Sequence, residues 1–451
     1  MNRRGRSLVV VGVAAAVLVA AGAVTLARSR ASCGAEVTSQ GADHSSSPFL
    51  DAAGRAQQPD RQRDTLVAAL AAAPSPFGQV LGAAGYHYEQ WAQVSAFAQG
   101  LGVRTRDNPD FTLLDDRTLR PRWSVAVTTS HSAYDASDRD YVVATMPRSA
   151  PPDLVELDAG TGHRRWCSSL GGRAVGPDDA YATQLLDDGG LVVLTRGDGS
   201  RQRVLRLAGN DGHHLWDRGI DAGDGDFLGS LGGGLVLAGG SRPERLADPR
   251  ALAARPSGQA LVGLATSSGK QRWAWRSPAR SGVHVLGTDP GSGLAVIEQW
   301  TAGQPPGRVF ALDRSGAEAW SVHPAEPGFF DATLRSGRVL VRAGTTWTAY
   351  DAGDGRRLWQ RTMPDHPQFL PYGFRLDDVP LLDPDHALLG TTTALRTLDL
   401  RDGSMTSAAL PTDGISTTYW PYQVAVTDGL IAVATNTGAV VVRHEAVPGR
   451  G

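Results

Sequence analysis

The chain has 451 residues and a formal net charge of −2 at pH 7, from 44 Lys and Arg against 46 Asp and Glu. Residues 1–30 contain five arginines and no acid, so the rest of the chain is mildly acidic. This balance excludes nucleic acid as a partner, because phosphate binding needs a concentrated basic surface.

The first predicted element is a membrane-spanning helix. Residues 8–27 carry no charge, and twenty helical residues span about 30 Å, the thickness of a bilayer's hydrocarbon core. Three arginines precede this run and two follow it, which predicts a cytoplasmic tail of residues 1–7 and an exported body. A cleaved signal peptide, ending near Ala21-Gly22-Ala23, is the alternative and would make the protein secreted.

A linker and a short helix are predicted next. Residues 28–59 are assigned to the linker, since residues 38–59 are rich in Ser, Gly, Gln and Pro. Residues 60–76 are predicted to be a short helical segment that prolines terminate. The chain has two cysteines, Cys33 and Cys167, too few for a disulfide framework or a zinc site. They could form one bridge in an oxidising compartment, and two unpaired thiols are the alternative.

A repeated unit begins after the predicted helix. Its clearest copy is LDAGTGHRRW at residues 157–166, which recurs as YDAGDGRRLW at residues 350–359. Each unit predicts a strand, a tight turn and a second strand, because Asp and Gly supply a side-chain hydrogen bond and a positive-φ position. An apolar strand precedes each unit, and eight such strands begin near Leu101, Tyr141, Leu191, Leu235, Leu294, Val339, Ala387 and Leu430.

The strand count predicts the architecture. Copies recur every 39 to 57 residues, as expected for propeller blades. Eight first strands with seven turn-and-outer-strand halves predict an all-β, eight-bladed β-propeller over residues 77–444, followed by a tail at 445–451. Residues 77–88 are predicted to donate the missing outer strand, because closing the ring removes exposed sheet edges. A seven-bladed ring is the alternative, if residues 101–115 are not a true inner pair.

The unit resembles the PQQ-type β-propeller repeat, whose core is Ala-Leu-Asp-x-x-Thr-Gly-x-x-x-Trp. The resemblance covers roughly residues 77–444, and the architecture is similar to that of the propeller lipoprotein of outer-membrane assembly. In that family the tryptophan docks between neighbouring blades, near a turn glycine, and donates its indole N–H to a carbonyl group. The resemblance therefore implies a structural blade-docking role for Trp123, Trp166, Trp216, Trp273, Trp320 and Trp359. The unit at 114–123 departs from the pattern, because Leu119 stands where the turn glycine is expected.

The same resemblance raises the question of catalysis. Quinoprotein dehydrogenases of this family have two adjacent cysteines over the cofactor and a calcium ion held by Glu, Asn and Asp. This chain has no adjacent cysteines. We therefore predict no catalytic residue, no cofactor and no metal, and keep a quinoprotein-like oxidoreductase that uses PQQ as the alternative function.

The predicted binding surface lies in the long irregular segments. In a propeller, the loops between second and third strands and the links between blades emerge on one face, where binding sites usually lie. Aromatic residues gather in those segments: Trp300, Phe369, Tyr372, Phe374, Tyr419, Trp420 and Tyr422. Aromatic side chains are favoured at interfaces, although they could instead close the mouth of the channel. The sequence predicts a membrane-anchored, non-catalytic binding or scaffold module with a protein or cell-envelope partner.

Overall fold

The computed structural model describes residues 37–41, 47–50, 61–73, 75–85, 92–97, 100–105, 111–127, 134–136, 140–145, 153–170, 182–196, 202–222, 225, 227–240, 259–302, 307–324, 331–362, 380–390, 394–409, 423–434 and 438–445. Among these residues no helix is long and apolar enough to cross a membrane. The predicted anchor at residues 8–27 lies outside the described residues.

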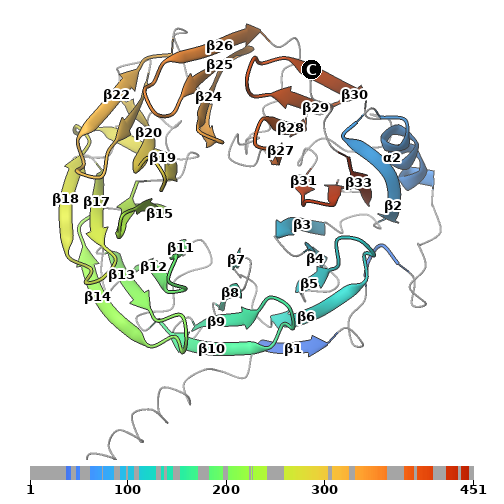
Figure 1. Ribbon diagram of the computed structural model, residues 1–451, viewed down its shortest axis with the longest axis horizontal. Helices are drawn as coiled ribbons and strands as arrows, with labels where there is room; N and C mark the ends of the chain where they lie inside the picture. The colour runs from blue at the N-terminus through green and yellow to red at the C-terminus, as the bar shows by residue number, and fades with distance from the viewer. Residues whose placement is uncertain are drawn as a thin grey trace, which may run out of the picture.

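The described strands form eight antiparallel sheets arranged around a ring (Figure 1). Sheet 1 contains β3 (Ala92–Phe97), β4 (Gly100–Thr105), β5 (Phe111–Leu114) and β6 (Pro121–Val127), with β1 (Val37–Gly41) as a fifth strand. Sheet 2 contains β7 (Tyr134–Ala136), β8 (Asp140–Thr145), β9 (Asp153–Asp158) and β10 (Arg164–Ser169). Sheet 3 contains β11 (Ala182–Leu185), β12 (Leu191–Arg196), β13 (Gln202–Leu207) and β14 (His214–Ile220).

The remaining sheets continue in chain order. Sheet 4 contains β15 (Phe227–Gly232), β16 (Leu235–Gly239), β17 (Ala260–Ala265) and β18 (Gln271–Arg276). Sheet 5 contains β19 (Ser281–Asp289), β20 (Leu294–Thr301), β21 (Arg308–Leu312) and β22 (Glu318–Val322). Sheet 6 contains β23 (Asp331–Arg335), β24 (Arg338–Ala343), β25 (Thr346–Asp351) and β26 (Arg357–Thr362). Sheet 7 contains β27 (Leu381–Asp383), β28 (His386–Gly390), β29 (Ala394–Asp399) and β30 (Met405–Ala409).

Sheet 8 closes the ring with a strand from the other end of the chain. It contains β31 (Gln423–Val426), β32 (Leu430–Ala434), β33 (Gly438–His444) and, on its outside, β2 (Phe77–Gly85). β2 pairs antiparallel with β33, with Ala84 opposite Ala439. The predicted donation of the outer strand by residues 77–88 is thus confirmed for residues 77–85. Helix α2 (Arg61–Ala71) precedes β2 and packs against both β2 and β33 (Figure 1).

Two sequence-based assignments need correction. The eight apolar strands expected to come first in each blade are the second strands, β4, β8, β12, β16, β20, β24, β28 and β32. Each sheet has a further strand on its inner side, and β7 and β27 are only three residues long. Residues 37–41, assigned to the linker, form β1, whose Val37 lies opposite Val127 of β6. The sequence of this segment has little strand pattern, so its strand conformation comes from pairing with the edge of β6.

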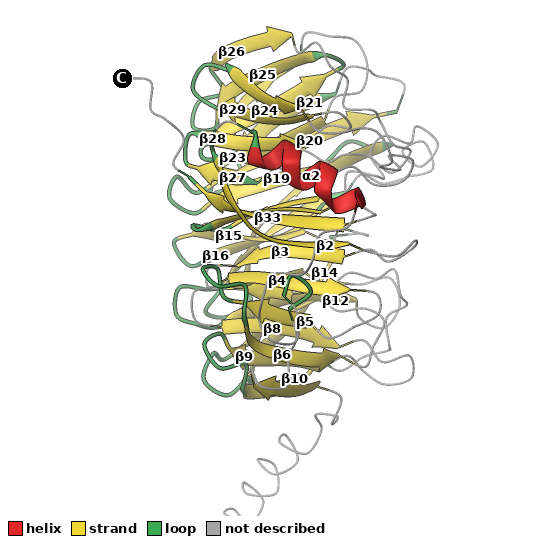
Figure 2. Ribbon diagram, turned by 90° about the vertical axis from the view of Figure 1, so that its right-hand side faces the viewer, coloured by secondary structure: helices red, strands yellow, loops and turns green. Residues whose placement is uncertain are grey.

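The outer hairpins are built by the Asp and Gly residues of the repeat. In sheet 2, Asp158 Oδ1 accepts the backbone N–H of Thr161 at 2.9 Å, and the Gly162 N–H donates to the Asp158 carbonyl at 2.7 Å. Gly162 has φ of 70°, a backbone conformation that residues with a Cβ rarely adopt. The described short turns lie together at one end of the ring (Figure 2), which we call the turn face; the opposite end is the loop face.

The apolar core lies in the seams between neighbouring sheets. The seam between sheets 4 and 5 is typical, since Leu237 and Leu261 pack with Val285 and Ile297, and all four are at most 2% exposed. Each sheet is buried on both faces by its neighbours, which explains why its middle strands are almost continuously apolar. The seams therefore determine how the ring is held together.

Candidate functional site

The structure describes one residue of the predicted aromatic surface. Phe369, Tyr372, Phe374, Tyr419, Trp420 and Tyr422 lie outside the described residues. Trp300 is described, and its side chain is 4% exposed in the core between sheets 5 and 6. Its assignment to an exposed binding surface needs correction, because β20 extends through Thr301 and directs this indole toward sheet 6 instead of into a loop.

Trp300 belongs to a buried polar cluster that the sequence did not indicate. Its Nε1 donates to Glu298 Oε1 at 2.6 Å, and Glu298 Oε2 lies 3.5 Å from His284 Nδ1. His284 and Glu298 are directly opposite in the β19–β20 pairing and are 6% and 3% exposed. Burying a carboxylate is costly unless it has partners. The indole and the imidazole supply those partners, so the cluster braces the loop-face end of this hairpin.

Six tryptophans join consecutive sheets on the turn-face side. The indole of Trp123 in sheet 1 donates to the carbonyl of Ala159 in sheet 2 at 2.9 Å. The same bond runs from Trp166 to Gly209, Trp216 to Thr266, Trp273 to Arg314, Trp320 to Ala352 and Trp359 to Leu400, at 2.7 to 3.2 Å. Each ring covers the turn glycine of the next sheet; a Cβ on Gly162 would lie 2.6 Å from the Trp123 ring. The geometry matches the blade-docking role that the repeat implied.

In the seam between sheets 8 and 1 the positions of the glycine and the large side chain are exchanged. Its outer strand β2 has Gly82 opposite Val441, beside a register shift like those beside the docking tryptophans. The neighbouring turn carries Leu119, with φ of 56°, where the other turns have glycine. A Cβ on Gly82 would lie 2.8 Å from Leu119 Cδ1 and 3.0 Å from Phe49 Cβ. In the other seams the large side chain, a tryptophan, is on the outer strand and the glycine is in the turn. Here the glycine, Gly82, is on the outer strand and the large side chain, Leu119, is in the turn, which explains why Leu119 departs from the repeat.

The seam between sheets 7 and 8 uses the N-terminal helix. The outer strand β30 contains no tryptophan. Leu66 and Leu70 of α2, which are 4% and 0% exposed, instead join the buried cluster of Leu382, Leu388 and Val440. The residues before β3 therefore contribute to both seams that lack a docking tryptophan.

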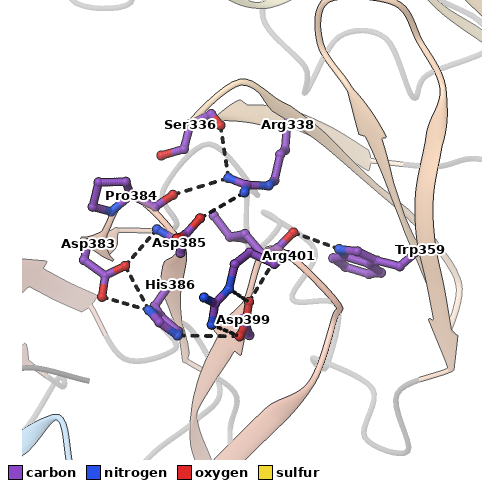
Figure 3. A network of polar contacts seen from close by, with 10 residues as sticks. Ser336, Arg338, Trp359, Asp383, Pro384, Asp385, His386, Asp399 and Arg401 are labelled. Carbon is purple, nitrogen blue, oxygen red and sulfur yellow. Dashed lines mark hydrogen bonds and ion pairs between the residues drawn. The ribbon is translucent and has the colours of Figure 1, made fainter. Parts of the chain in front are cut away.

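A polar network crosses the turn face between sheets 6 and 7 (Figure 3). Arg338 Nη2 donates to Asp385 Oδ1 at 2.9 Å, and Arg401 Nη2 donates to Asp399 Oδ2 at 2.7 Å. His386 Nδ1 lies 2.8 Å from Asp383 Oδ2, while its Nε2 lies 3.7 Å from Asp399 Oδ2. The hydrogen bond from Arg401 holds the pKa of Asp399 below its ordinary value and raises the pKa of Arg401.

A shallow cavity of about 320 Å³ opens beside this network, lined by Ser336, Gly337, Arg338, Asp351, Leu358 and Arg401. Both arginines are already engaged by carboxylates of the network, and Asp351 accepts the N–H of Gly353 at 2.8 Å. The cavity is therefore a gap between the contacts that join sheets 6 and 7. Within the described stretches, no group of three or more His, Cys, Asp and Glu side chains is arranged to hold a metal ion.

Cys167 lies on β10 and is disulfide-bonded. Its side chain packs in the seam between sheets 1 and 2 with the cluster that contains Trp123 and Val155. Cys33, the other cysteine of the chain, lies outside the described residues. Disulfide bonds persist in oxidising compartments and are rare in the cytosol.

The antiparallel sheets around a ring, joined by indoles docked on the next turn, define a β-propeller of the PQQ-like class. The sequence pattern of the family described as outer membrane protein assembly factor BamB matches residues 110–282 and 264–449. The chain belongs to this family. No curated protein matches the chain significantly.

Solved structures are similar to the chain at low sequence identity. Sqt1 of Saccharomyces cerevisiae is 9% identical, with a TM-score of 0.52 over 82% of this chain and 100% of Sqt1. BamB from Moraxella catarrhalis is 14% identical, with a TM-score of 0.47 over 81% of this chain and 99% of BamB. The quinohemoprotein alcohol dehydrogenase of Comamonas testosteroni is 12% identical, with a TM-score of 0.45 over 91% of this chain and 84% of the enzyme.

Proposed function

We propose that this chain is a membrane-anchored, extracytoplasmic, eight-bladed β-propeller that holds a protein or cell-envelope partner on its loop face, as a non-catalytic scaffold. The observation that carries the proposal is the family match over both halves of the propeller, to a family described as a protein assembly factor. The described turns of the opposite face are occupied by the contacts that join the sheets, such as Arg314 to the carbonyls of Leu231 and Pro290. We place the partner on the loop face because the long irregular segments of the sequence, with their aromatic residues, connect the strands there.

Export is supported by two independent features. The uncharged run at residues 8–27 has more arginines before it than after it. Cys167 is disulfide-bonded, as expected of a protein in an oxidising compartment. Retention of the N-terminal run as a single-pass anchor is part of the proposal; its cleavage would leave a secreted propeller with the same binding surface.

Cross-linking of the full-length chain in its native membranes would identify the partner, and purified components would then give a Kd. Trp420→Ala combined with Tyr372→Ala should weaken binding at least 30-fold, since an aromatic hot spot contributes about 2 kcal/mol. The matched control is Leu215→Ala on the outer strand β14, where Leu215 is 46% exposed. An unchanged Kd for the double variant, with the fold intact by circular dichroism, would contradict a partner site built on these aromatics.

A further inference from the structure

The link between sheets 4 and 5 is described completely, and it lies on the loop face. Residues 277–280 join β18, the outermost strand of sheet 4, to β19, the innermost strand of sheet 5 (Figure 1). β18 follows the turn at residues 266–270 on the turn face, so its other end, where the link begins, reaches the loop face. Arg280 is the last residue of the link and therefore lies on the inner side of the ring.

Hydrogen bonds hold both ends of this link. At its start, the Ser277 N–H donates to the Gln259 carbonyl at 2.9 Å, and the Gln259 side chain accepts the N–H of Val283 at 2.7 Å. At its end, the Ala302 N–H donates to the Arg280 carbonyl at 3.0 Å. Ser277 and Gln259 are 6% and 3% exposed, so the first attachment is in the interior. The backbone of Arg280 is therefore fixed before any partner binds.

The backbone of Arg280 is also strained. Its φ is 60°, in the left-handed region that residues with a Cβ rarely adopt. Leu119 and Ser336 are the other described residues, apart from glycine, with a positive φ. Leu119 is buried beside Gly82, and Ser336 shares a two-residue hairpin turn with Gly337 in which both take a positive φ. The Arg280 side chain is exposed, so packing does not explain it, and a strained residue of this kind indicates a functional role.

The guanidinium of Arg280 is unpaired, unlike its neighbours on the same face. Arg276, the last residue of β18, donates to Asp221 at 2.6 Å. Arg308, the first residue of β21, donates to Glu318 at 2.9 Å. Within the described part of the chain, the side chain of Arg280 makes no hydrogen bond and no ion pair. A guanidinium on a fixed backbone can bind a carboxylate through two parallel hydrogen bonds, with little further loss of freedom.

We propose that Arg280 is an anchor for the partner protein, and that it binds an aspartate or glutamate in a segment that docks on the loop face. This inference rests on the proposed function, because it gives the chemistry of the partner that the loop face is proposed to hold. Arginine is among the residues that most often dominate binding at protein interfaces. The strained link holds the guanidinium of Arg280 in place for such a carboxylate.

The test uses the full-length chain in its native membranes, with the photoreactive amino acid p-benzoylphenylalanine in place of Ala279, which is exposed next to Arg280. Illumination joins the label to the molecule that lies on the link, and mass spectrometry identifies the joined peptide. Arg280→Gln in the labelled chain removes the charge and keeps the strained backbone. The matched control is Arg272→Gln, which removes an exposed arginine from the turn-face side of the same β18.

The expected adduct is a protein segment that carries Asp or Glu beside the joined residue. Its yield should fall about tenfold in Arg280→Gln, the usual effect of losing a hydrogen bond between charged groups, and stay unchanged in Arg272→Gln. Arg280→Gly should lower the yield equally without lowering the urea midpoint of unfolding, because glycine adopts this φ readily. Arg280→Glu should abolish the adduct, and replacing the partner's acid with arginine should restore it.

An unchanged yield in Arg280→Gln, or a joined segment without an acid, would overturn the anchor. Adducts to lipid or glycan alone would also overturn it, since they would show a different occupant. If chemical cross-linking joins a partner to the chain but position 279 gives no protein adduct, the anchor fails and the proposed function stands. If no cross-linking of any kind joins a partner to the chain, the proposed function itself fails.

Discussion

Gly162→Ala tests how strongly the docked indoles hold the sheets together. In the structure a Cβ on Gly162 would lie 2.6 Å from two atoms of the Trp123 ring, which is 0% exposed and has no room to retreat. The substitution also places a side chain at φ of 70°. The cost has two parts, a backbone part from the left-handed conformation and a packing part from the displaced indole.

The magnitudes of the two parts can be separated with a matched glycine. Gly337 has the same φ of 70°, but a Cβ there would meet no atom within 4 Å. Gly337→Ala should therefore lose only the backbone part, about 1–2 kcal/mol. Gly162→Ala should lose in addition about 1–3 kcal/mol, the usual cost of overpacking a filled core.

The free energies of unfolding would be compared through urea midpoints, followed by far-UV circular dichroism on the full-length chain. The expected order of midpoints is wild type, then Gly337→Ala, then Gly162→Ala. Equal midpoints for the two variants would show that the Trp123 indole can move aside without lowering the free energy of unfolding. The docking contact would then contribute little to the stability of the ring.

Four further outcomes follow from the seams, the acids, the disulfide and the family. Leu70→Ala should lower the free energy of unfolding by about 2–5 kcal/mol, measured by the same urea series, because it opens a cavity where α2 replaces a docking tryptophan; a change below 1 kcal/mol would show that the helix is dispensable there. The pKa of Asp399 is lowered in the fold by the Arg401 hydrogen bond, so its stabilising contribution is present above the unfolded pKa near 4 and is lost as pH falls through the lower folded value. Stability measured from pH 6 to pH 3 should therefore decrease less in Asp399→Asn than in wild type, and parallel curves would contradict this. Under denaturing, non-reducing conditions the wild-type chain should take up no alkylating reagent by mass spectrometry, and Cys33→Ser should take up one at Cys167; two alkyl groups on wild type would contradict the bridge. The purified chain supplied with PQQ and calcium should not reduce a redox dye with alcohols or sugars, and steady reduction would favour the quinoprotein alternative.

Much of the outer ring could be predicted from the sequence, because its chemistry is local. The turn of each hairpin needs an acceptor such as Asp158 and a positive-φ residue such as Gly162, and both are visible as letters in a repeat. The docking of Trp123 on the next sheet was implied by the family resemblance, and its indole has the expected carbonyl acceptor. The strand donated to sheet 8 followed from counting hairpins, since a sheet that lacks one strand leaves an open edge.

The inner strands and the N-terminal contacts could not be predicted, because long-range pairing determines them. β7 and β27 have three residues each, too short for an alternating pattern to stand out. β1 is a strand because β6 offers it an edge, and Trp300 is buried because sheet 6 covers it. Leu119 was recognised as a departure from the repeat, but its explanation required Gly82, 37 residues earlier in the chain and on the opposite side of the seam.

The pairing of β2 with β33 has a consequence for the order in which the protein is made. β2 is among the first strands to leave the ribosome and β33 is the last described strand, so the ring closes only after nearly the whole chain has emerged. Contacts between such distant segments are slow to form, and an incomplete ring leaves the edges of both strands open to other chains. We therefore expect closure to be the late step of folding, and the interval before it to be when the protein most needs protection from aggregation.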